Sequence, residues 1–369
     1  MQKSDMTKIG DIISAIEERA PLALQESYDN AGLQLGDATA EARAALLCID
    51  VTEAVVDEAI ERGANLIVSH HPLIFRGLKR ITGRTPIERI VAKAIKNDIA
   101  IYSAHTNMDS AEGGVSVHAA RKIGLKNIKV LVPQSGKLLK IVTFVPSSHA
   151  EAVKQAMWSA GAGKIGNYDS CSYTMSGSGT FRALDGATPF VGTVGEHHTE
   201  SEERVEVILP RWRKHAVLAA MLAAHPYEEP AFDVIALENE SSTGLGVVGD
   251  VEPESALGLL RRVKSIFAVG AVSYSGGNVE QNVTRVAFCG GSAAEFIGDA
   301  IAAGAQIFIT GDVKYHDFTA YNDRIIIANI GHYESEQFTK EIFYDIIQKK
   351  IPNFATYYSE KEKNPINYL

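Results

Sequence analysis

Two distant stretches of the chain share one pattern of apolar and polar positions. Residues 46–71 align without a gap with residues 287–312, with five identities and matching apolar phasing at further positions. Each stretch predicts a buried strand, a helix of about three turns that ends at a glycine, and a second buried strand. Because the helix carries the chain back across the sheet, the two strands of each unit are expected to be parallel.

A further helix and strand follow each of these units. The patterns cover residues 86–97 and 99–104 after the first unit, and residues 318–322 and 324–330 after the second. We therefore predict an α/β fold in which two similar halves form one discontinuous core. Five identities also fit a chance resemblance between ordinary strand–helix–strand units, and that alternative stays open at this point.

The segment between the halves has a different pattern. Its apolar periods predict a strand, a helix, two strands, a helix and a strand, over residues 138–145, 150–160, 170–182, 204–209, 212–224 and 232–237. This βαββαβ order is that of a ferredoxin-like α+β module. Since loop-like residues flank the segment, we predict a first core half, an inserted domain and a second core half at residues 1–127, 128–240 and 241–369.

The composition is that of a soluble globular protein. Apolar residues make up 46% and charged residues 22% of the 369, and the net charge is −9. An acidic chain argues against nucleic-acid binding as the main task, because that usually needs a basic face. Residues 1–25 predict an amphipathic helix, not a signal peptide, and no apolar run approaches the length of a membrane span. Three scattered cysteines favour a reducing compartment, so we expect a cytoplasmic protein without membrane contact.

Polar side chains cluster directly after the buried strands of both halves. In chain order these clusters contain His70, His71, His105, Asp109, Asp312, Lys314, His316, His332, Tyr333 and Glu336. Ligand sites of open α/β sheets lie beyond the carboxyl ends of the parallel strands. The clusters are therefore expected to converge if the two halves face each other.

Five of these side chains favour a metal centre. Imidazole nitrogens and carboxylate oxygens are ligands for Zn, Fe and Mn ions. His332 and Glu336 lie four residues apart, so one helical face presents both. The adjacent His70 and His71 point to opposite sides of an extended chain, which suits two neighbouring ions better than one. With Asp109 as an anionic ligand and Glu336 as a bridge, we predict two divalent ions per subunit.

Other polar residues in the clusters stay undecided. His105, Asp312 and His316 fit structural hydrogen bonds as well as contacts to a ligand or substrate. We retain His105, Lys314, His316 and Tyr333 as candidates for substrate contact or proton transfer.

Five motifs of the chain resemble those of the GTP cyclohydrolase 1 type 2 homologs, also called Nif-three-like proteins. They occupy residues 28–33, 69–75, 105–109, 310–312 and 331–336 and so span almost the whole core. The resemblance implies a dinuclear metal site between two α/β halves. It also implies the ligand sets: one ion on His70 and Asp109, the other on His71 and His332, with Glu336 bridging.

The predicted insert resembles the PII and CutA-type modules found in longer members of that family. Residues 225–230, with the sequence HPYEEP, match the signature of this module. For the whole protein the resemblance implies a ring-shaped homohexamer whose metal sites face an inner cavity.

Two classes of function follow from these observations. The first is a metal-dependent hydrolase that acts on a nucleotide or related heterocycle, as GTP cyclohydrolase 1 type 2 would. The second is a non-enzymatic, metal-loaded hexameric regulator whose insert senses a ligand or binds a partner, conceivably DNA. The acidic charge speaks against DNA, and a pair of ions suited to activating water favours the hydrolase.

Overall fold

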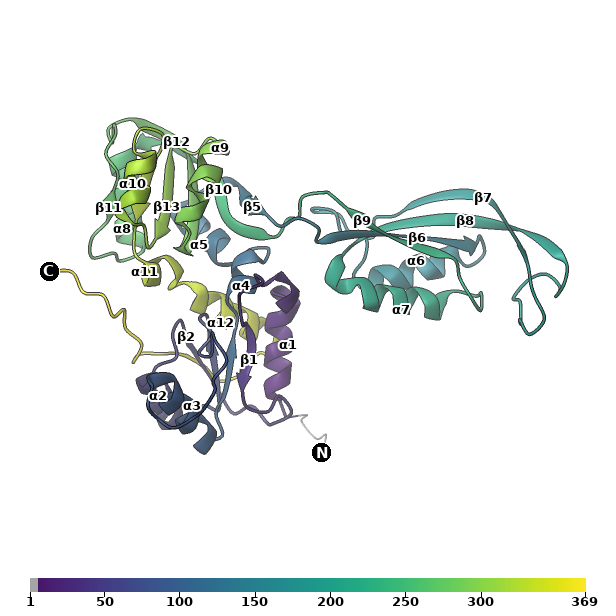
Figure 1. Cartoon of the computed structure of the whole chain (residues 1–369), viewed down its shortest axis with the longest axis horizontal. Helices are drawn as coiled ribbons and strands as arrows, with labels where there is room; N and C mark the ends of the chain where they lie inside the picture. The colour runs from purple at the N-terminus through teal and green to yellow at the C-terminus, as the bar shows by residue number, and fades with distance from the viewer. Residues whose placement is uncertain (1–5) are drawn as a thin grey trace. The chain divides into compact units, whose positions relative to one another are not determined.

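The computed structural model describes residues 6–369, so residues 1–5 of the predicted first half lie outside the described part (Figure 1). The chain forms two compact units. One unit comprises the residues up to Val132 together with Thr243–Leu369, and the other comprises Pro133–Ser242. Among residues 6–369, every helix is too short or too polar to cross a lipid bilayer.

The first sheet consists of four strands from the N-terminal half of the larger unit and one strand from the C-terminal end. Its strands lie in the order β1 (Gly32–Leu35), β4 (Ala100–Ser103), β3 (Leu66–Ser69), β2 (Ala45–Cys48) and β15 (Thr356–Tyr358). Strands β2, β3 and β4 are parallel, and β1 lies antiparallel at the edge. Helices α2 (Glu53–Glu61) and α3 (Pro86–Lys96) connect the parallel strands. Each helix begins where a threonine side chain, Thr52 or Thr85, accepts a hydrogen bond from the first turn.

The second sheet repeats this arrangement. Its strands lie in the order β11 (Ser273–Tyr274), β14 (Ile326–Asn329), β13 (Ile307–Gly311), β12 (Asn282–Ser292), β10 (Gly244–Ser255) and β5 (Lys126–Pro133). Strands β12, β13 and β14 are parallel, and β11 lies antiparallel at the edge, as β1 does in the first sheet. Helices α9 (Ile297–Ala302) and α10 (Tyr315–Tyr321) connect the parallel strands.

The two sheets also share one strand register. Ala45 pairs with Leu66 in the first sheet, and Val286 pairs with Ile307 in the second. Both members of the second pair lie 241 residues after their counterparts, which is the offset of the sequence repeat. The repeated apolar pattern therefore corresponds to equivalent strand pairs, an agreement that generic strand–helix–strand units would not require.

Four longer helices of the larger unit lie outside these strand connections: α1 (Ile9–Arg19), α5 (Val115–Ile123), α8 (Ala256–Ile266) and α12 (Thr339–Lys350). The isoleucine face of α1 is buried, with Ile12 and Ile16 fully enclosed. Burial of one apolar stripe is what stabilises an amphipathic helix. Helix α10 begins at Tyr315, three residues before the predicted start, so the segment with Lys314 and His316 is the beginning of a helix and not a loop.

The smaller unit consists of one antiparallel sheet and two helices. Its elements are β6 (Leu138–Pro146), α6 (Ala150–Ser159), β7 (Tyr173–Arg182), β8 (His197–Pro210), α7 (Lys214–Ala224) and β9 (Phe232–Leu237). The sheet order is β7-β8-β6-β9. Its core joins Ile141 and Val205 of the sheet to Val153 and Val217 of the helices. The unit begins at Pro133, not at the predicted residue 128, because the preceding residues form β5 beside β10.

Candidate metal centre

Short polar segments follow the parallel strands at their carboxyl ends. His70 and His71 come directly after β3. Strands β4 and β14 are each followed, after two residues, by a helix of five residues: α4 (Thr106–Ser110) and α11 (His332–Glu336). The first of these helices carries Asp109, and the second carries His332 and Glu336. The carboxyl ends of strands in both halves thus supply the candidate ligands.

The five predicted ligands lie in two groups of three that share Glu336. One group is His71, His332 and Glu336, the other is His70, Asp109 and Glu336, and within each the ligand atoms lie within 4.8 Å of one another. Oε2 of Glu336 lies 3.0 Å from Nε2 of His71 and 3.1 Å from Nε2 of His332. Its other oxygen, Oε1, lies 3.6 Å from Nε2 of His70. The carboxylate therefore faces both groups at once.

A hydrogen bond holds the Nδ1 atom in each of the three histidines among the candidate ligands, His70, His71 and His332. Nδ1 of His70 donates to the carbonyl oxygen of Ala104 at 2.9 Å. Nδ1 of His71 donates to Asp50 at 2.8 Å, and Nδ1 of His332 donates to Asp312 at 2.7 Å. Such bonds fix the orientation of the ring and leave Nε2 free to bind a metal ion. All three Nε2 atoms face Glu336.

The environment of His70 gives the clearest indication of an ion-binding position. Its side chain is fully buried, and Nε2 has no hydrogen-bond partner. The nearest carboxylates, those of Asp109 and Glu336, lie 3.7 Å and 3.6 Å away, too far for a full hydrogen bond. A buried polar atom without a partner is costly, and a metal ion between these three groups would supply one. The donor set present therefore fits a divalent ion.

The electrostatics of the cluster favour positive charge. Burial lowers the pKa of His71, but the hydrogen bonds to Asp50 and Glu336 outweigh burial and raise the pKa to about 10. The pKa of His332 is raised to about 9, because Glu336 and Asp312 outweigh burial there. Burial opposes the charge on Glu336, yet the surrounding histidines hold its pKa well below the usual range. The positively charged forms of His71 and His332 are therefore favoured beside the Glu336 carboxylate.

Comparison with known proteins identifies the family. The family model DUF34/NIF3 (NGG1p interacting factor 3) matches residues 7–365. The GTP cyclohydrolase 1 type 2 homolog of Halalkalibacterium halodurans is 41% identical, over 87% of each chain. The homolog of the same name from Bacillus subtilis is 36% identical over 97% of this chain and 98% of its own. The chain belongs to the DUF34/NIF3 family.

A solved structure of the DUF34/NIF3 family agrees with the fold. The crystal structure of a Bacillus cereus protein related to NIF3 superposes with a TM-score of 0.87 and 38% identity, and covers 99% of this chain and 100% of that one. The family membership expected from the sequence motifs is confirmed.

His105 lines the same cluster of this DUF34/NIF3 chain. Its ring centroid lies 5.2 Å from that of His70 and 5.5 Å from that of His71. Nδ1 donates to Oδ1 of Asp29 at 2.8 Å. Burial raises the pKa of Asp29, but the bonds from His105 and Thr106 outweigh burial and hold it at about 2. An ionised Asp29 thus orients His105.

The remaining candidates have their contacts elsewhere. Lys314 and His316 are exposed, and their backbone hydrogen bonds stay within the first turns of α10. The hydroxyl of Tyr333 accepts a hydrogen bond from Lys340 at 3.4 Å, and the lysine ammonium lies over the tyrosine ring. No contact recorded among residues 6–369 joins these three side chains to a candidate ligand.

Two supporting residues were missed by the sequence analysis. Asp50 orients His71, and Glu362 in turn holds the backbone of Asp50. Oε1 of Glu362 accepts hydrogen bonds from the N–H groups of Ile49 and Asp50 at 2.6 Å and 2.7 Å. Oε2 pairs with Nζ of Lys340 at 2.7 Å. Asp50 could have been found, since it follows the strand β2 at the same sheet edge, whereas Glu362 lies in a tail without a repeat partner.

A cavity adjoins the cluster on the side of His71. Its volume is about 540 Å³. Its lining has an apolar part that includes Leu73, Ile87 and Ile90, and a polar part made up of Asp50, Thr52, Glu53, His71 and Arg89. A small molecule seated there would lie against the candidate ligand His71.

Proposed function

We propose that this chain binds two divalent metal ions, with Zn, Fe and Mn as the ions that its ligands suit. His70 and Asp109 hold one ion, His71 and His332 hold the other, and Glu336 bridges them. The observation that carries this proposal is the position of Glu336, whose two oxygens face different histidines. The unpartnered Nε2 of His70 supports it.

We further propose that the centre serves a hydrolase that acts on a nucleotide or related heterocycle. The name of the relatives, GTP cyclohydrolase 1 type 2 homolog, supports this class. Two bound divalent ions lower the pKa of water and polarise the group under attack. Asp50 and Asp312 hold the rings of His71 and His332 in place during the reaction.

His105 is the residue best placed to move a proton. Asp29 accepts from Nδ1, which leaves Nε2 as the atom that takes or gives a proton. Substrate enters the cavity beside His71, whose apolar wall suits a flat heterocycle. Lys314, His316 and Tyr333 have no equivalent support from their contacts.

The test is metal analysis combined with a hydrolysis screen. The protein is purified without chelator, loaded with zinc, iron or manganese, and incubated with GTP and other nucleotides while formate release is measured. We expect turnover that Glu336→Ala abolishes. Two bound ions without turnover of any nucleotide would support the proposed metal site and contradict the proposed hydrolase activity. The absence of bound ions would contradict both proposals.

A second candidate function, the metal-loaded regulator, rests on a different observation. A cavity of about 910 Å³ is lined only by residues of the smaller unit, as a separate ligand site would be. We interpret this unit as ferredoxin-like and PII-like, since its βαββαβ order and its strand order β7-β8-β6-β9 suit that module. The ring-shaped homohexamer and the cytoplasmic location stay predictions, and sedimentation analysis of the full chain tests the former.

A further inference from the structure

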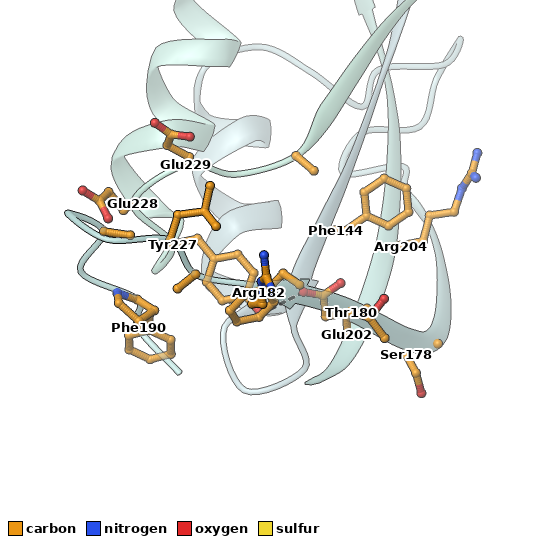
Figure 2. A pocket seen from close by; sticks show the side chains of 18 of the residues that line it. Phe144, Ser178, Thr180, Arg182, Phe190, Glu202, Arg204, Tyr227, Glu228 and Glu229 are labelled. Atoms are coloured by element: carbon orange, nitrogen blue, oxygen red, sulfur yellow. Dashed lines mark hydrogen bonds between the residues drawn. The ribbon is translucent and has the colours of Figure 1, made fainter. Parts of the chain in front are cut away.

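The cavity of the smaller unit has the size of a small-molecule site. Its volume of about 910 Å³ lies within the range of ligand pockets. Strand β7, the hairpin residues 183–190 and the loop 227–231 enclose it, and Figure 2 shows side chains from these segments facing one another. All of its lining residues belong to the smaller unit, whereas the candidate metal ligands all belong to the larger one.

Aromatic rings form much of the wall. The ring centroids of Phe181 and Phe190 lie 6.1 Å and 6.4 Å from that of Tyr227. Phe144 adds a fourth ring from β6. Aromatic faces carry partial negative charge, so they attract the positive group of a bound cation.

A buried carboxylate lies within this aromatic wall. Glu202 is only 8% exposed, and its Oε1 accepts a hydrogen bond from the Tyr227 hydroxyl at 2.8 Å (Figure 2). Its Oε2 lies against the backbone of β7, because a Cβ atom at Gly179 would come within 2.0 Å of it. The glycine thus permits the carboxylate to lie flat on the strand.

The other charges of the lining leave the cavity acidic. Glu228 and Glu229 add two carboxylates near its rim. Of the two arginines, Arg204 pairs with Glu206 at 2.7 Å, which leaves Arg182 to oppose three carboxylates. An anionic ligand would be repelled, and a cationic one attracted.

We propose that this cavity binds a small organic cation with a flat apolar body, such as an amine, amidine or guanidine. The positive group pairs with the carboxylate of Glu202, and the body packs among Phe181, Phe190 and Tyr227. A charged hydrogen bond to a buried carboxylate provides selectivity, and the rings provide contact area.

The test compares two probes of equal shape on the full, metal-loaded chain. Benzamidine carries a positive amidinium group on a flat ring, and benzamide is its neutral counterpart. We expect calorimetry to show benzamidine binding at least about tenfold more tightly than benzamide, since a hydrogen bond between charged groups is stronger than one between neutral groups. Glu202→Gln is expected to abolish this preference.

A second variant keeps the test valid if Glu202→Gln does not fold. Gly177 pairs with Glu202 in the sheet, so a side chain there points to the same face. A Cβ at this position would meet no protein atom within 4 Å. Gly177→Leu should therefore fill the cavity and block benzamidine without loss of folding, while Gly177→Ala should bind it nearly as well as the parent chain.

Four outcomes would overturn the proposal, and three of them concern the affinities for the probes. They are equal affinity for both probes, no binding of benzamidine, and binding that Gly177→Leu leaves unchanged. The fourth outcome is an affinity for benzamidine that falls as the concentration of the chain rises. It would indicate that a second copy of the chain covers the cavity, and it would equally overturn the proposal.

Discussion

Oε2 of Glu336 lies 3.0 Å from Nε2 of His71, although the two residues are 265 positions apart and come from different halves of the repeat. The same carboxylate faces His70 through its other oxygen. One side chain therefore connects both groups of candidate ligands, and its removal should affect both.

We predict that Glu336→Ala binds neither ion tightly, whereas His332→Ala retains the ion held by His70 and Asp109. Loss of a bridging carboxylate removes a ligand from each ion, but loss of His332 removes a ligand from one. Elemental analysis after gel filtration gives the number of ions per chain. Glu341→Gln, on helix α12, is the matched control, since Glu341 pairs with Lys122 and His118 outside the cluster. Two ions retained by Glu336→Ala would contradict the bridge.

The metal-free chain should become less stable as the pH rises from about 7 to 10. His71 and His332 have pKa values of about 10 and about 9 in the folded chain, above the usual value near 6.5. A group whose pKa is raised on folding stabilises the fold fully below its unfolded pKa and loses that effect as the pH passes its folded pKa. Melting temperatures of the chelator-treated chain measured across this range check the prediction.

Metal binding should show the opposite dependence on pH. An ion must displace the protons of His71 and His332, so its apparent affinity should rise through the same range by up to about tenfold per pH unit for each proton. Calorimetry in buffers of different ionisation enthalpy counts the protons released. A proton count of zero at pH 7.5 would show that neither histidine binds the ion.

Glu362→Ala should lower the affinity for the ion that His71 is proposed to hold. The substitution leaves two backbone N–H groups and Lys340 without their acceptor, and it loosens Asp50, which orients His71. Residues that hold a ligand from behind typically contribute about 10–100-fold in metal affinity. Glu362→Gln should restore part of this affinity, because an amide oxygen still accepts from both N–H groups. A purely structural role would lower the melting temperature of the metal-free chain and leave the affinity unchanged.

Gly36→Ala should destabilise the chain far more than Gly63→Ala. Both glycines have positive φ angles, 102° and 67°, so both substitutions cost about 1 kcal/mol or more in backbone strain. A Cβ at Gly36 would also lie 2.7 Å from Cα of Ala100 in strand β4, whereas a Cβ at Gly63 meets nothing within 4 Å. Denaturant unfolding of both variants measures the difference. Equal destabilisation would mean that β4 can shift.

The sequence predicted those parts of the fold that depend on local patterns. The repeat, the parallel strands and the polar clusters at the strand ends follow from apolar periodicity over short windows, and the five candidate ligands lie together as expected from their positions. The sequence also predicted the order of elements in the smaller unit, although β8 begins at His197, seven residues before the predicted start. The polar residues at the beginning of β8 conceal the strand, because β7 pairs with them at the exposed end of the hairpin.

Contacts between distant segments were not predictable in this way. Strands β5 and β15 lie at sheet edges, where β10 and β2 supply their hydrogen bonds. Glu362 acts on Asp50 across 312 residues, and nothing in the tail identifies it as a partner. The sequence makes Tyr333 a candidate for substrate contact or proton transfer because it follows His332. A helix turns adjacent residues to different sides, however, and the Tyr333 hydroxyl faces Lys340.

The hydrogen bonds of Glu362 to Ile49 and Asp50 have a consequence for biosynthesis. During translation, the first half of the repeat leaves the ribosome long before Glu362, which holds the backbone of Ile49 and Asp50. A growing chain can therefore present His70 and His71 but cannot complete the support of Asp50 behind His71 until Glu362 has been made. Tight binding of an ion by His71 is thus expected only after Glu362 has been synthesised and has folded against Asp50.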